Sequence, residues 1–175
     1  MNGANIELHC ASGKFLPVDT CMDFWRDIGF SFTPIKMVTL EAWPWEGAQE
    51  QCPPVLDGME DLVKTGKIVF LYGGVDGINA GIEMERTDEP QPRFITEFWA
   101  NVALLPEMDY SPLDGRPREV ERFYSRVEKA LARFDPFGLL LAGIGVENYV
   151  CCRQTIEETM AHSHVDRWLF PKRRD

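Results

Sequence analysis

The sequence predicts an α+β fold: one domain over residues 1–175, with a mixed, largely antiparallel sheet and helices packed mainly on one face. Short apolar segments, some strictly alternating, are typical of strands, and longer segments with apolar residues three or four apart are typical of helices. Three central strands follow one another with short connections, which favours antiparallel neighbours. With 175 residues, 45% hydrophobic and 26% charged, the chain has the size and composition of one globular domain.

The first half of the chain is predicted to contain strand, helix, strand and helix. Alternating apolar residues predict a strand over residues 5–10, and a second strand follows at residues 35–42. Between them, apolar residues at helical spacing predict a helix over residues 19–28, with Asp19 as its N-cap. A short helix is expected over residues 57–65, where a glycine follows and ends it.

The second half is predicted to form the centre of the sheet and the longest helix. Residues 67–72 are apolar on both faces, which is typical of a central strand, and the glycines that follow supply the positive φ angles of a tight reversal. The expected order of elements is βαβαβββαβα. The remaining strands and helices are expected over residues 78–86, 93–101, 117–134, 138–146 and 155–168.

Charge is divided unevenly along the chain. Residues 1–115 hold 19 acidic and 7 basic side chains, a formal charge of −12, whereas residues 116–175 hold 9 acidic and 11 basic ones, a charge of +2. The net charge of −10 disfavours direct binding to nucleic acid or an anionic membrane and suits a protein partner with a basic surface. A row of basic residues shares one face of the longest helix, at Arg118, Arg122, Arg126, Lys129 and Arg133. The pattern leaves open whether this row docks a partner, is solvated, or is neutralised by the chain's own acids.

No motif in the chain predicts catalysis, a cofactor or a metal site. The glycines after residue 72 match neither a dinucleotide nor a phosphate-binding loop, and no GxSxG is present. His162 and His164 lie in a segment with helical spacing, where residues two apart point in different directions and do not share an ion. The five cysteines form no CxxC pair, and the N-terminus lacks the pattern of a signal peptide. We therefore expect reduced thiols and a cytoplasmic protein.

These features predict a non-catalytic, protein-binding inhibitor. The loop Trp43-Pro44-Trp45-Glu46 combines large aromatic rings with a carboxylate, which is typical of interfaces with basic partners. In class, the chain resembles bacterial immunity proteins, and that resemblance implies occlusion of a basic toxin cleft by acidic and aromatic side chains. The predicted partner contacts are Trp43, Trp45, Glu46, Asp57, Glu60, Asp61, Arg122 and Arg126.

Two other functions and the oligomeric state stay open at this level. A phage-type inhibitor that mimics nucleic acid would also be strongly acidic. A small enzyme with an acidic cleft could use Glu83, Glu85 and Glu97, or the segment from His162 to Asp166. The sequence also leaves a homodimer open.

Overall fold

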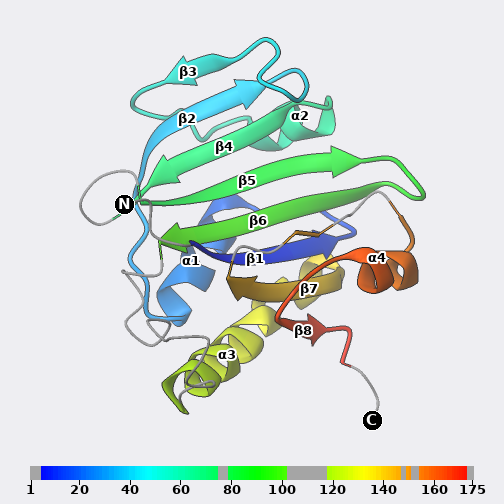
Figure 1. Cartoon of the computed structure of the whole chain (residues 1–175). Helices are drawn as coiled ribbons and strands as arrows, with labels where there is room; N and C mark the ends of the chain where they lie inside the picture. The colour runs from blue at the N-terminus through cyan, green and yellow to red at the C-terminus, as the bar shows by residue number, and fades with distance from the viewer. Residues whose placement is uncertain (1–4, 75–78, 102–117, 147–148, 151–153, 173–175) are drawn as a thin grey trace.

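The computed structural model contains one sheet of eight strands, in the spatial order β3-β2-β4-β5-β6-β1-β7-β8, and its strand pairings are antiparallel (Figure 1). The structure describes residues 5–74, 79–101, 118–146, 149–150 and 154–172. The strands are β1 Asn5–Ser12, β2 Pro34–Leu40, β3 Gln49–Gln51, β4 Ile68–Gly73, β5 Ala80–Thr87, β6 Arg93–Asn101, β7 Leu139–Val146 and β8 Arg167–Phe170. The helices are α1 Val18–Asp27, α2 Met59–Lys64, α3 Arg118–Ala130, the 3-10 helix η4 Leu131–Phe137, and α4 Ile156–His162. The predicted α+β class is confirmed.

Helices α1, α2, α3 and η4 cover one side of the sheet, which we call the helical face. The main hydrophobic core lies beneath them, because the apolar side of each helix and the alternating apolar residues of the strands are removed from water together. At its centre the ring of Phe24 lies 4.9 Å from that of Phe98 and 5.0 Å from that of Phe134. These three rings join α1, β6 and η4.

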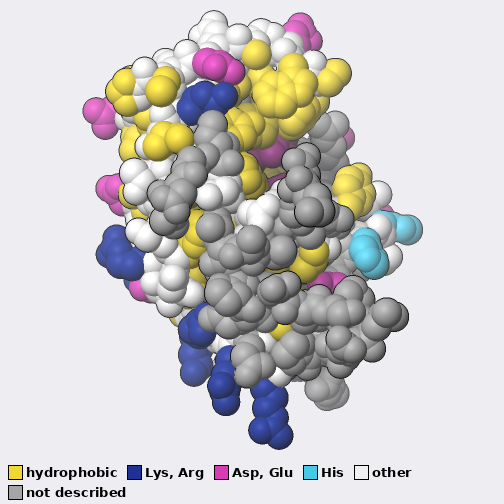
Figure 2. Space-filling view, turned by 60° about the vertical axis from the view of Figure 1, so that its left-hand side comes forward, with side chains coloured by type: hydrophobic (Ala, Val, Ile, Leu, Met, Phe, Trp, Pro, Cys, Tyr) yellow, Lys and Arg dark blue, Asp and Glu magenta, His cyan; other side chains and the backbone are white. Residues whose placement is uncertain are grey.

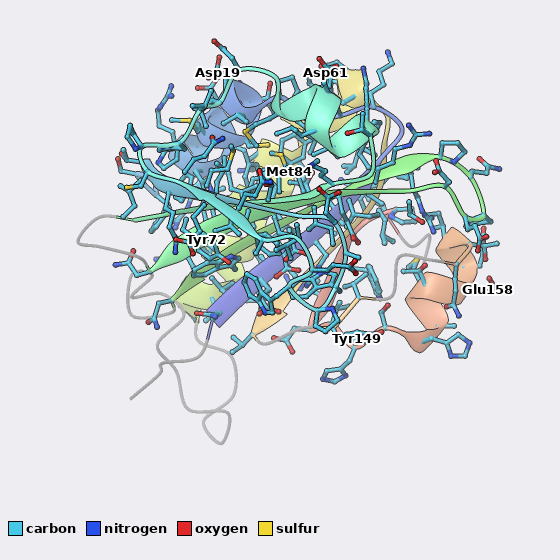
Figure 3. All side chains as sticks on the ribbon, turned by 90° about the horizontal axis from the view of Figure 1, so that it is seen from above. Asp19, Asp61, Tyr72, Met84, Tyr149 and Glu158 are labelled. Carbon is cyan, nitrogen blue, oxygen red and sulfur yellow. The ribbon has the colours of Figure 1, made fainter. Side chains whose placement is uncertain are left out.

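The opposite side of the sheet carries two smaller apolar clusters separated by carboxylates, and we call it the acidic face. At one end, residues of α4 pack against Ala11, Ile95 and Leu141. At the other end lies a cluster that includes Phe70. In Figure 3, α1 and α2 (with Asp19 and Asp61) lie on one side of the strands, whereas α4 (with Glu158) lies on the other.

Two edge strands were not predicted from the sequence. β3 consists of Gln49, Glu50 and Gln51, all exposed, so it lacks the apolar alternation that marks a strand and is defined by its pairing with β2. β8 lies where the spacing predicts the last part of a helix over residues 155–168. That helix ends at His162, and the next residue is extended (φ −86°, ψ 148°). The chain then pairs with β7, which provides the backbone partners that a longer helix would have supplied internally.

The longest predicted helix also differs at its end. α3 stops at Ala130, and a 3-10 helix that contains Pro136 follows it. That helix ends at Phe137, and the next residue, Gly138, has a φ of 69°, which favours glycine. No helix among the described residues has both the length and the apolar character needed to cross a membrane.

Candidate functional site

The centre of the acidic face is a row of directly opposed residues that runs across the strands. Phe70 on β4 is opposite Glu83 on β5, Glu83 is opposite Glu97 on β6, and Glu97 is opposite His9 on β1. The row continues from His9 to Gly143 on β7. Directly opposed residues point their side chains to the same face of a sheet, so two carboxylates and an imidazole are placed side by side.

Two glycines make room for tryptophan rings beside this row. A Cβ atom at position 81 would lie 2.5 Å from the ring of Trp99, and one at position 143 would lie 2.8 Å from the ring of Trp168. Contacts this short are not tolerated, so any larger residue would displace the rings. The absence of a side chain at Gly81 and Gly143 therefore lets each indole lie against the backbone of the neighbouring strand.

An aromatic cluster, defined as Trp43, Trp45, Phe70 and Tyr72, lies at the Phe70 end of the row. Phe70 stacks on Trp45 at 5.9 Å and on Tyr72 at 5.9 Å, and Trp43 meets Phe70 edge-on at 5.5 Å. Figure 2 shows hydrophobic side chains gathered at the upper part of the molecule. Trp43 is 46% exposed and Trp45 is 52% exposed, so a large part of both rings remains in contact with solvent.

The loop that carries the two tryptophans is closed by its own backbone. The amide of Glu46 donates to the carbonyl of Ala42 at 2.9 Å, and the amide of Glu41 donates to the carbonyl of Glu46 at 2.8 Å. Trp45 has a φ of 60°, a left-handed conformation that bulky side chains rarely adopt. Such conformations persist only where surrounding contacts hold them, and functional sites often contain them.

The carboxylates of the row have perturbed acidities. Burial is the main reason that the pKa of Glu83 is raised to about 8; the charge of Glu97 adds to the increase, and a hydrogen bond with the Trp43 side chain opposes it. The pKa of Glu97 is also raised, mainly by burial, while His9 lowers it. Close carboxylates in a partly buried site raise one another's pKa because only some of them can be charged at once. The row can therefore hold a proton or accept a cation near neutral pH.

His9 connects this row to a third carboxylate. Its Nδ1 lies 3.3 Å from Oε2 of Glu97, and its Nε2 lies 3.7 Å from Oε2 of Glu7, the residue two positions earlier on the same strand. His9 is 7% exposed, and the side chains of Glu7 and Glu97 are 18% and 24% exposed. Glu7, His9 and Glu97, which we call the Glu-His-Glu group, thus form a compact cluster in which a buried imidazole lies between two partly exposed carboxylates.

The residues predicted as partner contacts fall in three separate places. Trp43, Trp45 and Glu46 lie together in the loop at the edge of the acidic face. Asp57, Glu60 and Asp61 lie in and just before α2, whose buried residues belong to the main core on the helical face. Arg122 and Arg126 lie on α3. The structure therefore does not join the three groups into one surface.

The basic row of the long helix is partly neutralised within the chain. Nε of Arg133 donates to Oδ2 of Asp27 at 3.0 Å, and Nη1 lies 3.6 Å from Asp23, so α1 supplies counter-charges. Arg126 is half-buried, and its guanidinium lies 5.6 Å from the ring centre of Phe123. Arg118, Arg122 and Lys129 are exposed, and Figure 2 shows basic side chains projecting at the lower end of the molecule, at the height of α3 in Figure 1.

The remaining candidates are the residues that the sequence suggested for a small enzyme. His162 is the exposed last residue of α4, and His164 exchanges backbone hydrogen bonds with Tyr149. Asp166 accepts a hydrogen bond from the amide of Val146 at 3.2 Å. Glu83, Glu85 and Glu97, proposed as acids of an enzyme cleft, do share the acidic face, as their strand pairing requires.

Sequence reasoning missed Glu7, His9 and Trp99 as members of this site. The alternation of β1 places Glu7 and His9 on the face opposite Ile6 and Leu8, a signal that was readable. The pairing of β1 with β6 was not readable, because it joins the first and the sixth strand along the chain.

Comparisons of this chain with protein-family models, with curated proteins and with solved structures find no match in any of the three.

Proposed function

We propose that this chain is a non-catalytic binding protein whose acidic face receives cationic side chains of a partner protein. The observation that carries the proposal is the aromatic cluster: two half-exposed tryptophans pack on buried Phe70, Trp45 stacked and Trp43 edge-on, with Trp43 hydrogen-bonded to Glu83. Exposed aromatic rings beside a carboxylate offer both of the interactions that an arginine or lysine side chain makes.

The chain itself provides an internal example of this recognition. Nζ of Lys36 lies 5.3 Å from the ring centre of Tyr72 and 3.4 Å from Oε1 of Glu50. An ammonium group is thus held between an aromatic ring and a carboxylate at the rim of the aromatic cluster. A cation over an aromatic face contributes about 0.5–2 kcal/mol, more where water is excluded.

In its finer form, the proposal is a toxin-neutralising protein that occludes a basic cleft. The charge of −12 over residues 1–115 supports it, because a strongly negative surface accelerates encounter with a positive one. Trp43 and Trp45 would be the anchors of the interface, and Glu46 would contribute at its rim.

The test combines partner capture with a matched pair of variants. Tagged protein is used to isolate its partner from the native cell, and the association rate is then measured with purified partner over a range of salt concentrations. We expect Trp45→Ala to weaken binding by at least about 30-fold, which corresponds to a hot-spot loss of about 2 kcal/mol. Asp61→Asn, a carboxylate on α2 at the helical face, is the control and should bind like the parent.

Two results would overturn the proposal. The first is a partner whose binding is unaffected by Trp45→Ala and Glu83→Gln but is lost with Asp61→Asn. The second is an association rate that does not fall with rising salt, because charge steering requires about a tenfold or larger decrease.

One observation supports a second candidate, a small enzyme. Glu83, with a pKa raised to about 8, lies directly opposite Glu97, and a carboxyl group that stays protonated near neutral pH can act as a general acid. An enzyme predicts turnover that Glu83→Gln abolishes while partner binding persists. A binding protein predicts that the same change alters binding alone.

A further inference from the structure

Glu7, His9 and Glu97 lie close enough together to share one cation. One ligand atom from each residue lies within 4.8 Å of the other two. The nearest pairs are His9 Nδ1 to Glu97 Oε2 at 3.3 Å and His9 Nε2 to Glu7 Oε2 at 3.7 Å. A tetrahedral ion about 2.0–2.1 Å from each ligand atom holds those atoms roughly 3.4 Å apart, so either distance suits an ion bound to the nitrogen concerned. The two ring nitrogens point in different directions, so the ion binds one of them and the carboxylate beside the other turns toward it.

The buried imidazole supplies a second, independent observation. His9 is more than nine-tenths buried, and its Nε2 has no hydrogen-bond partner, although it faces the Glu7 carboxylate. A buried polar atom without a partner is destabilising, so most such atoms have a hydrogen bond, a water or an ion. The unpartnered nitrogen is directed toward a carboxylate, which is the arrangement that a metal ion between them would complete.

The strand geometry explains how the three side chains converge. Glu7 and His9 are two residues apart on β1, so they point to the same face, and Glu97 is directly opposite His9 on β6. Both strands are in the interior of the sheet, with β5 beyond β6 and β7 beyond β1. The Glu-His-Glu group is therefore built on paired interior strands, from which the ligand side chains turn toward one ion.

The donor set selects the kind of ion. One imidazole nitrogen with two carboxylate oxygens suits divalent transition metals such as Zn²⁺, whereas Mg²⁺ and Ca²⁺ prefer sites made only of oxygen atoms.

We propose that Glu7, His9 and Glu97 form a binding site for one divalent transition-metal ion, for which Zn²⁺ is the probe. One nitrogen of His9 binds the ion, together with one carboxylate oxygen of Glu7 and one of Glu97. Three protein ligands leave at least one further coordination position for an exogenous group. The site does not depend on the partner proposed for the aromatic cluster.

The experiment is a Zn²⁺ titration of the metal-stripped protein, with stoichiometry by calorimetry and with thermal melting as a second readout. A Cys52→Ser background removes the exposed thiol among the described residues, which could otherwise bind the metal. We expect one Zn²⁺ per chain. The affinity for Zn²⁺ should fall by at least about a hundredfold in both His9→Gln and Glu97→Gln. Loss of a residue that only supports a ligand costs up to about a hundredfold in affinity, and loss of a ligand itself should cost at least as much. Mg²⁺ and Ca²⁺ should not compete.

The matched control removes the other histidines of the chain. The double variant His162→Gln, His164→Gln should keep the full affinity for Zn²⁺, and Trp45→Ala should also keep it while binding the protein partner more weakly. Circular dichroism confirms folding, and Glu7→Gln replaces His9→Gln if the latter does not fold. Absence of saturable Zn²⁺ binding would show that His9 only bridges two carboxylates as an ion pair, and the proposal would be wrong. It would also be wrong if binding survived in Glu97→Gln and disappeared in the His162, His164 double variant.

Discussion

The two faces of this sheet are built from the same strands but differ in burial and in the kind of side chain that they carry. On the helical face, Ile82, Met84 and Phe98 are almost fully buried and belong to the main hydrophobic core. On the acidic face, the alternate residues of the same strands include Glu83, Glu97 and Trp99, which are half-buried. The first arrangement maximises the removal of apolar surface from water, whereas the second keeps charges and exposed rings at a cost in stability. The acidic face is therefore not optimised for the burial of apolar surface.

The largest expected effect is a difference in stability between variants at two adjacent residues of β6, Phe98 and Trp99. Phe98→Ala should lower the free energy of unfolding by about 3–5 kcal/mol, because the ring is fully buried against Phe24 and Phe134. Trp99→Ala, on the opposite face, should cost only about 1–2 kcal/mol, since its larger ring is half-buried. Urea unfolding of both variants provides the measurement. Equal losses would remove the energetic difference between the two faces.

The second prediction concerns the pH dependence that Glu83 gives to stability. Its pKa is raised from an ordinary value of 4.5 to about 8, so the folded protein binds a proton that the unfolded chain releases. This contribution is fully present below about pH 4.5 and is lost as the pH rises through about 8. Glu83→Gln removes the titrating group. We expect the variant to gain about 4 kcal/mol of stability relative to the parent between about pH 5 and pH 9.

The control for this pH profile is Asp61→Asn on the helical face. It also removes one carboxylate, but from an exposed position on α2. Its stability relative to the parent should stay constant over the same range. If the stability of Glu83→Gln changed with pH in parallel with that of the parent, the partly buried surroundings assigned to Glu83 would be wrong.

The third prediction concerns the close contact between β5 and the indole of Trp99. Gly81→Ala would place a Cβ atom 2.5 Å from that ring, which must then move outward, at a cost of about 1–2 kcal/mol. The tryptophan fluorescence should shift as the ring becomes more exposed. Gly13→Ala is the control, since its nearest contact would be an ordinary 3.8 Å, and its stability should change by less than about 0.5 kcal/mol. If both variants behaved alike, Trp99 would not lie against β5.

The sequence predicted the helical face better than the acidic face, for a physical reason. Apolar periodicity is a local signal, so α1, β1 and the meander of β4, β5 and β6 could be located from neighbouring residues. The acidic face depends on pairings between distant segments, such as β1 with β6, which no local pattern encodes. Glu83 and Glu97 could be assigned to a polar face, but their contact with His9 could not.

The two edge strands, β3 and β8, were not predicted from the sequence for a related reason. β3 is entirely polar and exposed, and β8 lies in a segment whose spacing also suits a helix. Both segments become strands because they hydrogen-bond to the backbone groups that the neighbouring strand presents at its edge. The predicted interface residues were likewise chosen by type and not by face, which is why Asp57, Glu60 and Asp61 lie on the side opposite Trp43 and Trp45.

The smallest effects come from single exposed glutamates, one on each side of the sheet. Glu60→Gln removes an i,i+4 ion pair with Lys64, whose atoms lie 2.6 Å apart, and should cost about 0.3–0.5 kcal/mol. Glu46→Gln, in the tryptophan loop, should change stability no more than that, because the side chain is exposed. The two variants should differ only in partner binding, where Glu46→Gln slows association and Glu60→Gln does not. Because their charge change and stability effects match, a difference in association rate would identify the face that binds. Equal slowing by both would mean that the partner responds only to the net charge of the chain.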